Sequence, residues 1–250
     1  MESSNRRKFL KVGGAGLATV ISTPFLAHAS ETKKANKIPE NLTILMQGDS
    51  ITDAGRDKAR YYANDAGGMG RGYVFQIVSS LLGTHPEVRL RFYNRGISGN
   101  KVFQLADRWE DDCLQLKPNV LSILIGVNDF WHSLRDYPGT AESYEADFRK
   151  LLDRTLKEMP DLKLIIGEPF AVKGGKAIDD SWFPDFPKYQ EAATKIAKDY
   201  KAQFIPYQKI FDEALDNAKV SYWCPDGVHP SMAGAFLMKE EWIKAFEKLY

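Results

Sequence analysis

Four short polar clusters along the chain hold the residue types that a serine nucleophile needs for acyl transfer. A serine hydroxyl attacks a carbonyl only when a base removes its proton, and that base needs a third group to fix its tautomer. The clusters supply a serine, a glycine turn, a side-chain amide and a carboxylate with an imidazole. They lie at residues 48–50, 94–100, 126–129 and 226–229.

Ser50 is the candidate nucleophile, with His229 as its base and Asp226 as the partner of that base. Asp226 and His229 are three residues apart around Gly227, a spacing that brings both side chains to one face of a turn. The alternatives are structural, because a serine after a strand commonly caps a helix and a histidine before Pro230 commonly caps or packs. For each residue taken alone the structural role is the more common one, so the catalytic interpretation depends on all four clusters.

Acyl transfer also needs hydrogen-bond donors for the oxyanion. Ser50 offers its own backbone N–H, Gly99 offers an N–H in a turn that disfavours bulkier residues, and Asn128 offers a side-chain amide. We therefore predict these three residues as the oxyanion hole. The alternative for Gly99 and Asn128 is that they are ordinary turn residues.

Short apolar runs alternate with amphipathic stretches and indicate the elements that position these clusters. The runs predict strands at 42–47, 88–93, 120–125, 162–167 and 203–205. The stretches predict helices at 73–82, 102–116, 141–159, 188–202 and 231–250. This alternation predicts an α/β fold in which helices cover both faces of a parallel sheet of about five strands. Ligands bind beyond the carboxyl ends of such strands, where the clusters fall.

The N-terminal segment is predicted to be an export signal rather than part of the fold. Residues 1–29 have a basic start with Arg6 and Arg7, a weakly apolar middle and the small-residue exit Ala27-His28-Ala29, which resembles a twin-arginine signal. The alternative is an uncleaved membrane anchor, but the 15-residue segment 12–26 is shorter than the roughly 20 residues needed to span a bilayer. We expect a polar tether at 30–40, one domain at 41–250, and a periplasmic or extracellular location.

Composition excludes several classes of partner. Removal of 1–29, which holds four basic residues and one acidic residue, changes the formal net charge from +1 to −2. A near-neutral domain gives no support to nucleic acid or an anionic membrane surface as a partner, and we expect no stable membrane insertion after signal cleavage. Cys113 and Cys224 form no metal-binding or redox motif, and we interpret them as free or buried thiols. The sequence does not indicate an oligomeric state.

The four clusters carry a resemblance to a known family. The segments GDSITDAGR, NRGISGNKV, GVNDFW and DGVHPS resemble, in order and spacing, the four sequence blocks of the SGNH/GDSL hydrolases. This resemblance implies a flavodoxin-like three-layer α/β/α sandwich and esterase or lipase-type activity without a cofactor. It also implies the same roles for the triad and oxyanion residues. The chain departs from the family in one letter, with Ile51 in place of the leucine of GDSL.

Two other functional classes remain as alternatives. A metal-dependent phosphoesterase would need clustered ligands, for which Asp49, Asp53, Asp129 and Asp226 are imaginable, but the sequence offers no HExxH motif and no close histidine pair. We expect no metal. A non-catalytic glycan-binding module would keep the fold without the triad, which is intact here. The glycine-rich run 67–72 matches no phosphate-binding motif, and we interpret it as a flexible loop beside the site.

The substrate is predicted from aromatic residues in the loops around the crevice. Trp131, Trp182 and Trp223 lie in or beside these loops, where flat rings suit sugar faces, and Asp49 is a further candidate contact. The alternative is that the tryptophans pack in the core or at its edge. We expect the substrate to be a short-chain ester of a carbohydrate or other small molecule, with an O-acetyl ester as the first choice. The second choice is a lysophospholipase or thioesterase activity.

Overall fold

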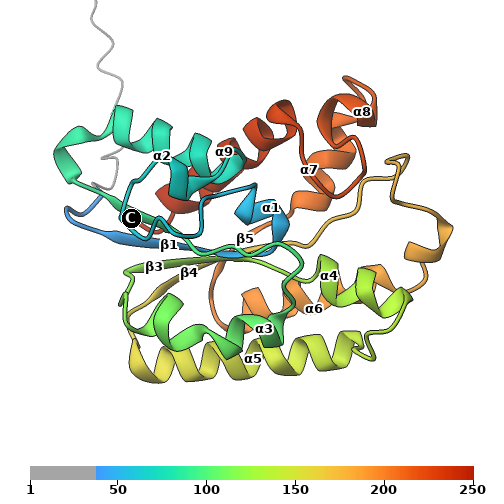
Figure 1. Ribbon diagram of the computed structural model, residues 1–250, viewed down its shortest axis with the longest axis horizontal. Helices are drawn as coiled ribbons and strands as arrows, with labels where there is room; N and C mark the ends of the chain where they lie inside the picture. The colour runs from blue at the N-terminus through green and yellow to red at the C-terminus, as the bar shows by residue number, and fades with distance from the viewer. Residues whose placement is uncertain (1–37) are drawn as a thin grey trace, which may run out of the picture. The chain divides into compact units, whose positions relative to one another are not determined.

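The computed structural model describes residues 38–250, which form an α/β fold around one parallel sheet (Figure 1). The predicted export signal and most of the predicted tether lie outside the described residues. Ile38 is buried in the core, and Glu40 forms an ion pair with Arg89 at 2.6 Å. Ile38 and Glu40, at the end of the predicted tether, therefore already contact the described domain.

The sheet has five parallel strands in the order β2-β1-β3-β4-β5. The strands are β1 (Thr43–Gly48), β2 (Arg91–Asn94), β3 (Val120–Leu124), β4 (Lys163–Gly167) and β5 (Gln203–Ile205). In the register, Ile44 of β1 pairs with Phe92 of β2 on one side and with Val120 of β3 on the other. Every residue of β1 and β3 is buried, as expected of strands covered on both faces.

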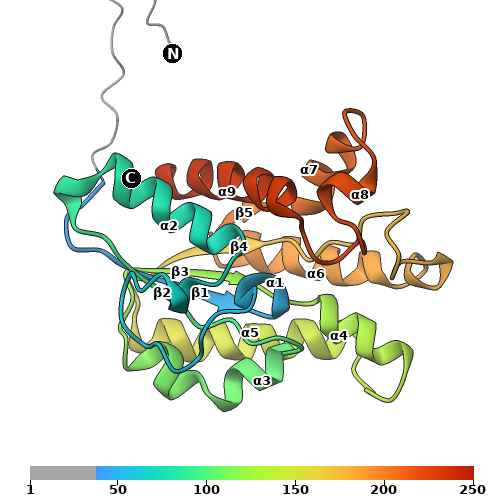
Figure 2. The same ribbon diagram turned by 45° about the horizontal axis from the view of Figure 1, so that its top comes forward.

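Helices cover both faces of the sheet, which confirms the predicted three-layer sandwich. The longer helices are α2 (Tyr73–Thr84), α5 (Ala141–Glu158), α6 (Phe186–Asp199), α7 (Tyr207–Ala214) and α9 (Met232–Glu247). The short ones are α1 (Ser50–Asp53), α3 (Val102–Asp107), α4 (Val127–Trp131) and α8 (Val220–Trp223). Helices α2 and α9 pack together on one face, and α3, α5 and α6 lie on the other (Figures 1 and 2).

The predicted helix at 102–116 is divided into two pieces. α3 ends at Asp107, and a π-helical turn, η3 (Glu110–Leu114), follows it. Trp109 lies between the two pieces, fully buried, and its Nε1 donates to Thr155 Oγ1 of α5 at 2.8 Å. The apolar spacing that indicated one helix therefore comes from two consecutive helical segments that face the same core.

The strand order places the ends of β1 and β3 side by side at the point where the chain changes direction across the sheet. The chain passes from β1 to β2 on one side and then returns to β3 on the other side. Open α/β sheets bind ligands at such a switch point. Ser50 follows β1 and Asn128 follows β3, so the fold alone brings these two candidates to one edge.

The described residues also show the state of the two cysteines and the hydropathy of the helices. Cys113 and Cys224 are both free and buried, as interpreted from the sequence, and burial raises the pKa of each thiol to about 12. Within residues 38–250, no helix is both long enough and apolar enough to cross a membrane.

Candidate active site

The structure brings Ser50, His229 and Asp226 into one hydrogen-bonded row. Ser50 Oγ lies 2.7 Å from His229 Nε2, although the two residues are 179 positions apart in the chain. On the other side of the ring, His229 Nδ1 lies 2.7 Å from Asp226 Oδ2. Ser50 is the first residue of α1, immediately beyond β1, so the edge of the sheet presents its hydroxyl to the imidazole.

The turn from Asp226 to His229 is shaped by its own backbone. Asp226 Oδ1 accepts hydrogen bonds from the N–H groups of Val228 at 2.9 Å and His229 at 2.7 Å. Gly227 adopts a φ of 89°, and a Cβ atom there would lie 2.7 Å from the carbonyl oxygen of Val172. Glycine is therefore required at this position, and the turn leaves Oδ2 of Asp226 free to bind the imidazole.

These contacts shift the pKa values of both triad partners in the direction that an Asp–His pair requires. Burial acts to raise the pKa of Asp226, but the hydrogen bonds from His229 and the two backbone N–H groups outweigh it and lower this pKa to about 2. The hydrogen bond to Asp226 raises the pKa of His229. Asp226 thus stays ionised, and an ionised carboxylate at this position favours the protonated form of the His229 imidazole.

The predicted oxyanion donors Gly99 and Asn128 lie on adjoining segments. Asn128 Nδ2 donates to the carbonyl oxygen of Asn100 at 3.3 Å, which holds the amide beside the turn that contains Gly99. Gly99 has a φ of 79°, in the left-handed region that favours glycine. The arrangement suits a site that receives donors from Ser50 N–H, Gly99 N–H and the Asn128 amide.

The turn that carries Gly99 is fixed by charged side chains that sequence reasoning missed. Arg56 Nε donates to the carbonyl oxygen of Gly96 at 2.7 Å. Arg108 Nη1 donates to the carbonyl oxygen of Arg95 at 2.9 Å. Charged residues in a sequence usually indicate a solvated surface, so no pattern distinguished these arginines as supports of a buried turn.

Asp53, the last residue of α1, also stabilises the turn that carries Gly99. Its Oδ2 accepts hydrogen bonds from Ser98 N at 2.9 Å and Ser98 Oγ at 3.1 Å, next to Gly99. Its carboxylate also forms an ion pair with Lys58 at 2.9 Å. The sequence analysis considered Asp53 as a possible metal ligand. In the structure, its carboxylate instead stabilises the turn by hydrogen bonds.

The prediction that Asp49 contacts substrate is wrong. Asp49 is fully buried, and its Oδ1 accepts a hydrogen bond from the N–H of Ile51 at 2.9 Å. It is the N-cap of α1, the role that the sequence analysis considered for Ser50 instead. Burial raises the pKa of Asp49 to about 7.

The prediction that Trp182 lies on the rim of the crevice is also wrong. Trp182 is only 1% exposed and packs in an aromatic cluster, with ring centroids 5.1 Å from Phe130 and 5.4 Å from Phe186. Trp131 contacts the same cluster, 5.5 Å from Trp182, and is partly exposed. Trp223 is partly exposed as well. Only these last two tryptophans are accessible to a substrate in the loops discussed.

A cavity of about 220 Å³ opens beside the Ser50 hydroxyl and the His229 imidazole. Its other lining residues are Ile51, Ala54, Arg71, Gly72, Tyr73, Pro230 and Ala235. Arg71 and Gly72 come from the end of the glycine-rich run, which therefore does lie beside the site. Arg71 could not be identified from the sequence, since one arginine among glycines has no diagnostic spacing.

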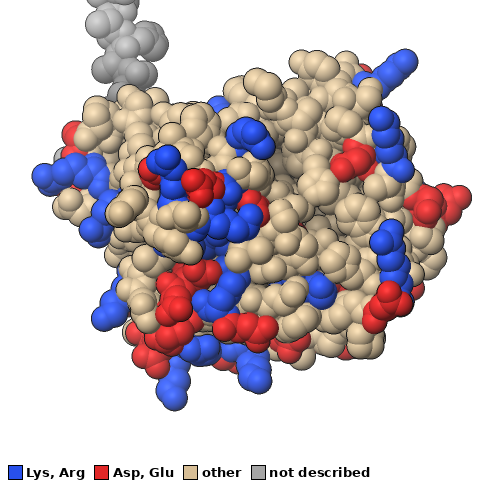
Figure 3. Space-filling view, viewed as in Figure 1, with Lys and Arg blue, Asp and Glu red and all other residues tan. Residues whose placement is uncertain are grey.

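The charged groups outside the site form no broad region of one sign on the visible face. Lys and Arg side chains are interspersed with Asp and Glu side chains in Figure 3. Among the described residues 38–250, no three His, Cys, Asp or Glu side chains are arranged to hold a metal ion.

Comparisons with known proteins agree with this fold and site. Residues 47–235 match the model of the GDSL-like Lipase/Acylhydrolase family. The acetylxylan esterase of Geobacillus stearothermophilus is 34% identical over 215 residues, covering 83% of this chain and 95% of that protein. Its crystal structure has a TM-score of 0.73 at 33% identity and covers 84% of this chain and 95% of that chain.

A second solved structure is similar over the same region. The crystal structure of a GDSL-like lipase from Parabacteroides merdae has a TM-score of 0.82 at 45% identity, and covers 84% of this chain and 97% of that chain. The fold and the family match together define an α/β protein of the carboxylic ester hydrolase class. The chain belongs to the GDSL-like lipase/acylhydrolase (SGNH) family, whose members are carboxylic ester hydrolases, and this confirms the resemblance seen in the sequence blocks.

Proposed function

We propose that this protein is an O-acetyl esterase of carbohydrate that acts through a Ser50–His229–Asp226 triad. The observation that carries the proposal is the unbroken row of contacts from Ser50 Oγ to His229 and from His229 to Asp226, each 2.7 Å long. A related protein supports it, because structures of two catalytic mutants of the Geobacillus stearothermophilus acetylxylan esterase replace a serine and an aspartate by alanine.

The proposed reaction begins with attack of Ser50 Oγ on the ester carbonyl while His229 Nε2 accepts the hydroxyl proton. The oxyanion receives hydrogen bonds from the N–H groups of Ser50 and Gly99 and from the Asn128 amide. His229 then returns the proton to the sugar oxygen as the C–O bond breaks, and an acetyl-enzyme remains. Water, deprotonated by His229, attacks this acyl-enzyme, and Ser50 regains its proton as acetate leaves.

The preference for a short acyl group rests on the small space beside the nucleophile, which has to admit the saccharide next to its ester as well as the acyl group. A volume of about 220 Å³ beside Ser50 is below the roughly 300–1,000 Å³ of pockets that enclose drug-sized ligands. The Geobacillus stearothermophilus relative, described as an acetyl-xylooligosaccharide esterase, supports an acetyl ester as the substrate.

A series of p-nitrophenyl esters of increasing chain length, together with an acetylated xylooligosaccharide, tests the proposal. We expect the acetyl ester to be cleaved faster than the octanoyl ester, and acetate to be released from the oligosaccharide. Ser50→Ala is the control for both assays. A preference for long-chain esters or lysophospholipid over acetylated sugar would favour the second choice, a lysophospholipase or thioesterase.

We also propose export to the periplasm or the extracellular space, from the residues of the predicted signal. An esterase of polymeric carbohydrate needs access to substrate outside the cell, which agrees with this location. Fractionation of cells that express the full chain, with N-terminal sequencing of the product, tests it. A product in the cytoplasm with an intact N-terminus would contradict both the location and the cleavage after Ala29.

A further inference from the structure

Arg71 is a cation at the catalytic cavity for which residues 38–250 provide no carboxylate partner. It lies between η1 (Gly67–Met69) and α2, is exposed, and lines the same cavity as Ser50 and His229. Its backbone N–H donates to the carbonyl oxygen of Ala54 at 3.0 Å, which fixes its position relative to α1. The site therefore has a guanidinium that is anchored at its backbone and free at its charged end.

The guanidinium lies over the loop that follows the nucleophile. A Cβ atom built on Gly55 would be 2.8 Å from Arg71 Nη2, so the small residue at 55 leaves room for this group. Gly55 has a φ of 71°, a conformation that glycine adopts without strain. Gly55 thus allows the Arg71 guanidinium to lie close to the backbone of this loop.

Two other exposed basic side chains near this loop have carboxylate partners, whereas the buried Arg56 donates to the carbonyl oxygen of Gly96 at 2.7 Å. Arg60 forms ion pairs with Asp57 at 3.2 Å and Asp65 at 3.1 Å. Lys58 forms an ion pair with Asp53 at 2.9 Å. No Asp or Glu side chain lines the catalytic cavity within the described residues. Arg71 therefore differs from the exposed cations Lys58 and Arg60, which the protein itself neutralises, and from Arg56, which is buried.

The position of His229 indicates which part of an ester lies near Arg71. His229 Nε2 must reach the alcohol oxygen of the substrate in order to protonate it, so the saccharide leaves Ser50 on the side of the imidazole. Arg71 and His229 line one cavity. A group attached to the saccharide close to its acetyl ester would thus lie in the same cavity as Arg71.

We propose, building on the proposed acetylesterase function, that Arg71 binds a carboxylate carried by the saccharide, and that the enzyme prefers acetylated oligosaccharides that contain a uronic acid. A guanidinium presents paired N–H donors that match a carboxylate, and such charge-assisted hydrogen bonds are stronger than those to neutral hydroxyl groups. A cation without an acidic partner gives this contact without first breaking an ion pair.

Two substrates that differ in one group test the inference. One is an acetylated oligosaccharide with a uronic acid unit, and the other is the same oligosaccharide with that carboxyl group reduced to the alcohol. Acetate release gives kcat and KM for each, at low and high ionic strength. We expect kcat/KM to be about tenfold higher for the acidic substrate, mainly through KM, and this preference to decrease with salt.

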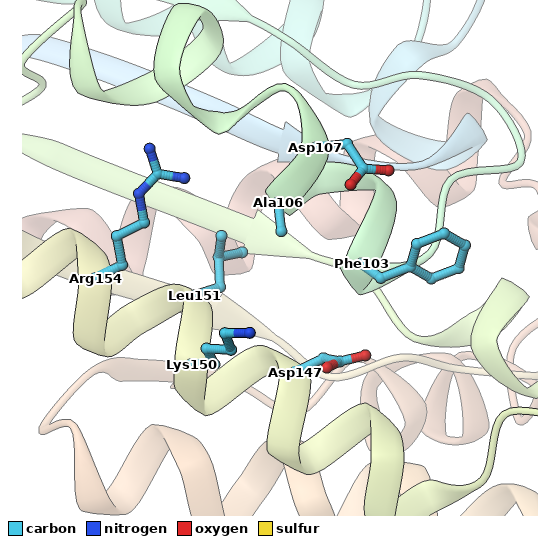
Figure 4. A pocket seen from close by; sticks show the side chains of 7 residues that line it. All are labelled: Phe103, Ala106, Asp107, Asp147, Lys150, Leu151 and Arg154. Carbon is cyan, nitrogen blue, oxygen red and sulfur yellow. The ribbon is translucent and has the colours of Figure 1, made fainter.

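Variants assign the preference to a residue. Arg71→Gln should abolish it, and Arg71→Lys should keep part of it, because an ammonium retains the charge but loses the paired geometry. The matched control is Arg154→Gln, which removes the same charge from a separate cavity of about 360 Å³ between α3 and α5 (Figure 4). It should keep the full preference. Circular dichroism and melting curves verify that each variant is folded.

Three outcomes would overturn the inference. They are equal kcat/KM for the two oligosaccharides with the wild-type enzyme, a preference that persists in Arg71→Gln, and an equal loss on both substrates in that variant. Failure of the proposed function gives a different result, since neither oligosaccharide would be deacetylated while p-nitrophenyl acetate was still cleaved.

Discussion

The carboxylate of Asp129 accepts a hydrogen bond from the backbone N–H of Val102, with Oδ1 and N 3.1 Å apart. Asp129 follows Asn128 in α4, and Val102 begins α3, so this contact joins the segments that follow β3 and β2. The Asn128 amide makes a second link between the same segments through the carbonyl oxygen of Asn100. The two contacts hold Gly99 and Asn128, the proposed oxyanion donors, in a fixed relation to each other.

Asp129 should therefore act as a positioning residue. Asp129→Ala is expected to lower kcat for p-nitrophenyl acetate about tenfold with little change in KM, because the donors lose their alignment for the transition state. Asp129→Asn keeps the Oδ1 acceptor and should recover most of the rate. Steady-state kinetics of both variants measure this. An asparagine variant as impaired as the alanine variant would contradict the role assigned to the Val102 contact.

Asn128 itself should contribute mainly to the transition state. We expect Asn128→Ala to lower kcat by roughly 10²–10³ with KM nearly unchanged, since an oxyanion donor binds charge that develops during the reaction. Initial-rate kinetics over a range of p-nitrophenyl acetate concentrations provide the test. If the defect lay entirely in KM, Asn128 would be a substrate-binding residue instead.

The rate should rise with pH through the ionisation of His229. The hydrogen bond to Asp226 raises the pKa of His229 above its ordinary 6.5, and the base must be neutral to accept the serine proton. The midpoint of kcat/KM against pH should therefore lie above 6.5, with activity lost below it. Asp226→Asn should lower both the midpoint and the maximal rate. A midpoint that does not move in this variant would argue against the Asp226–His229 coupling.

The two neighbouring tryptophans should behave differently. Trp182→Ala removes a buried ring and should lower the free energy of unfolding by about 3–5 kcal/mol. Trp131→Ala, at a partly exposed ring, should cost less stability and raise KM for an acetylated oligosaccharide without affecting p-nitrophenyl acetate. Chemical denaturation and kinetics on both substrates separate these effects. Equal loss of stability in the two variants would contradict the difference in burial.

Much of the fold was predictable because the strands are short, apolar-rich segments that alternate with amphipathic stretches. β3 was expected at 120–125 and spans Val120–Leu124, and β5 was expected at the residues where it lies. The order of strands was not predictable, since alternation of strands and helices fixes their parallel direction but not which strands become neighbours. The split after Asp107 was missed because both helical pieces keep the same apolar spacing.

The site residues that belong to the ordered sequence blocks were predictable. The residues whose role depends on packing were less so. Ser50 and His229 are far apart in the chain, yet the blocks identified both, and the structure brings them together. Trp182 was assigned to the rim because a sequence does not reveal which aromatic rings a loop buries. Arg71 was missed because its significance depends on which carboxylates lie near it, a property of the folded chain alone.

The central claim is that Ser50 is an activated nucleophile, and covalent labelling tests it most directly. The wild-type protein is incubated with a serine-directed organophosphonate, and intact mass and peptide mapping locate the adduct. Ser50→Ala and His229→Ala are treated in parallel, with circular dichroism to confirm their folding. We predict one adduct per chain, on Ser50, with none in Ser50→Ala and much slower labelling in His229→Ala. An unlabelled wild-type protein, or an adduct on another residue that persists in Ser50→Ala, would contradict the account.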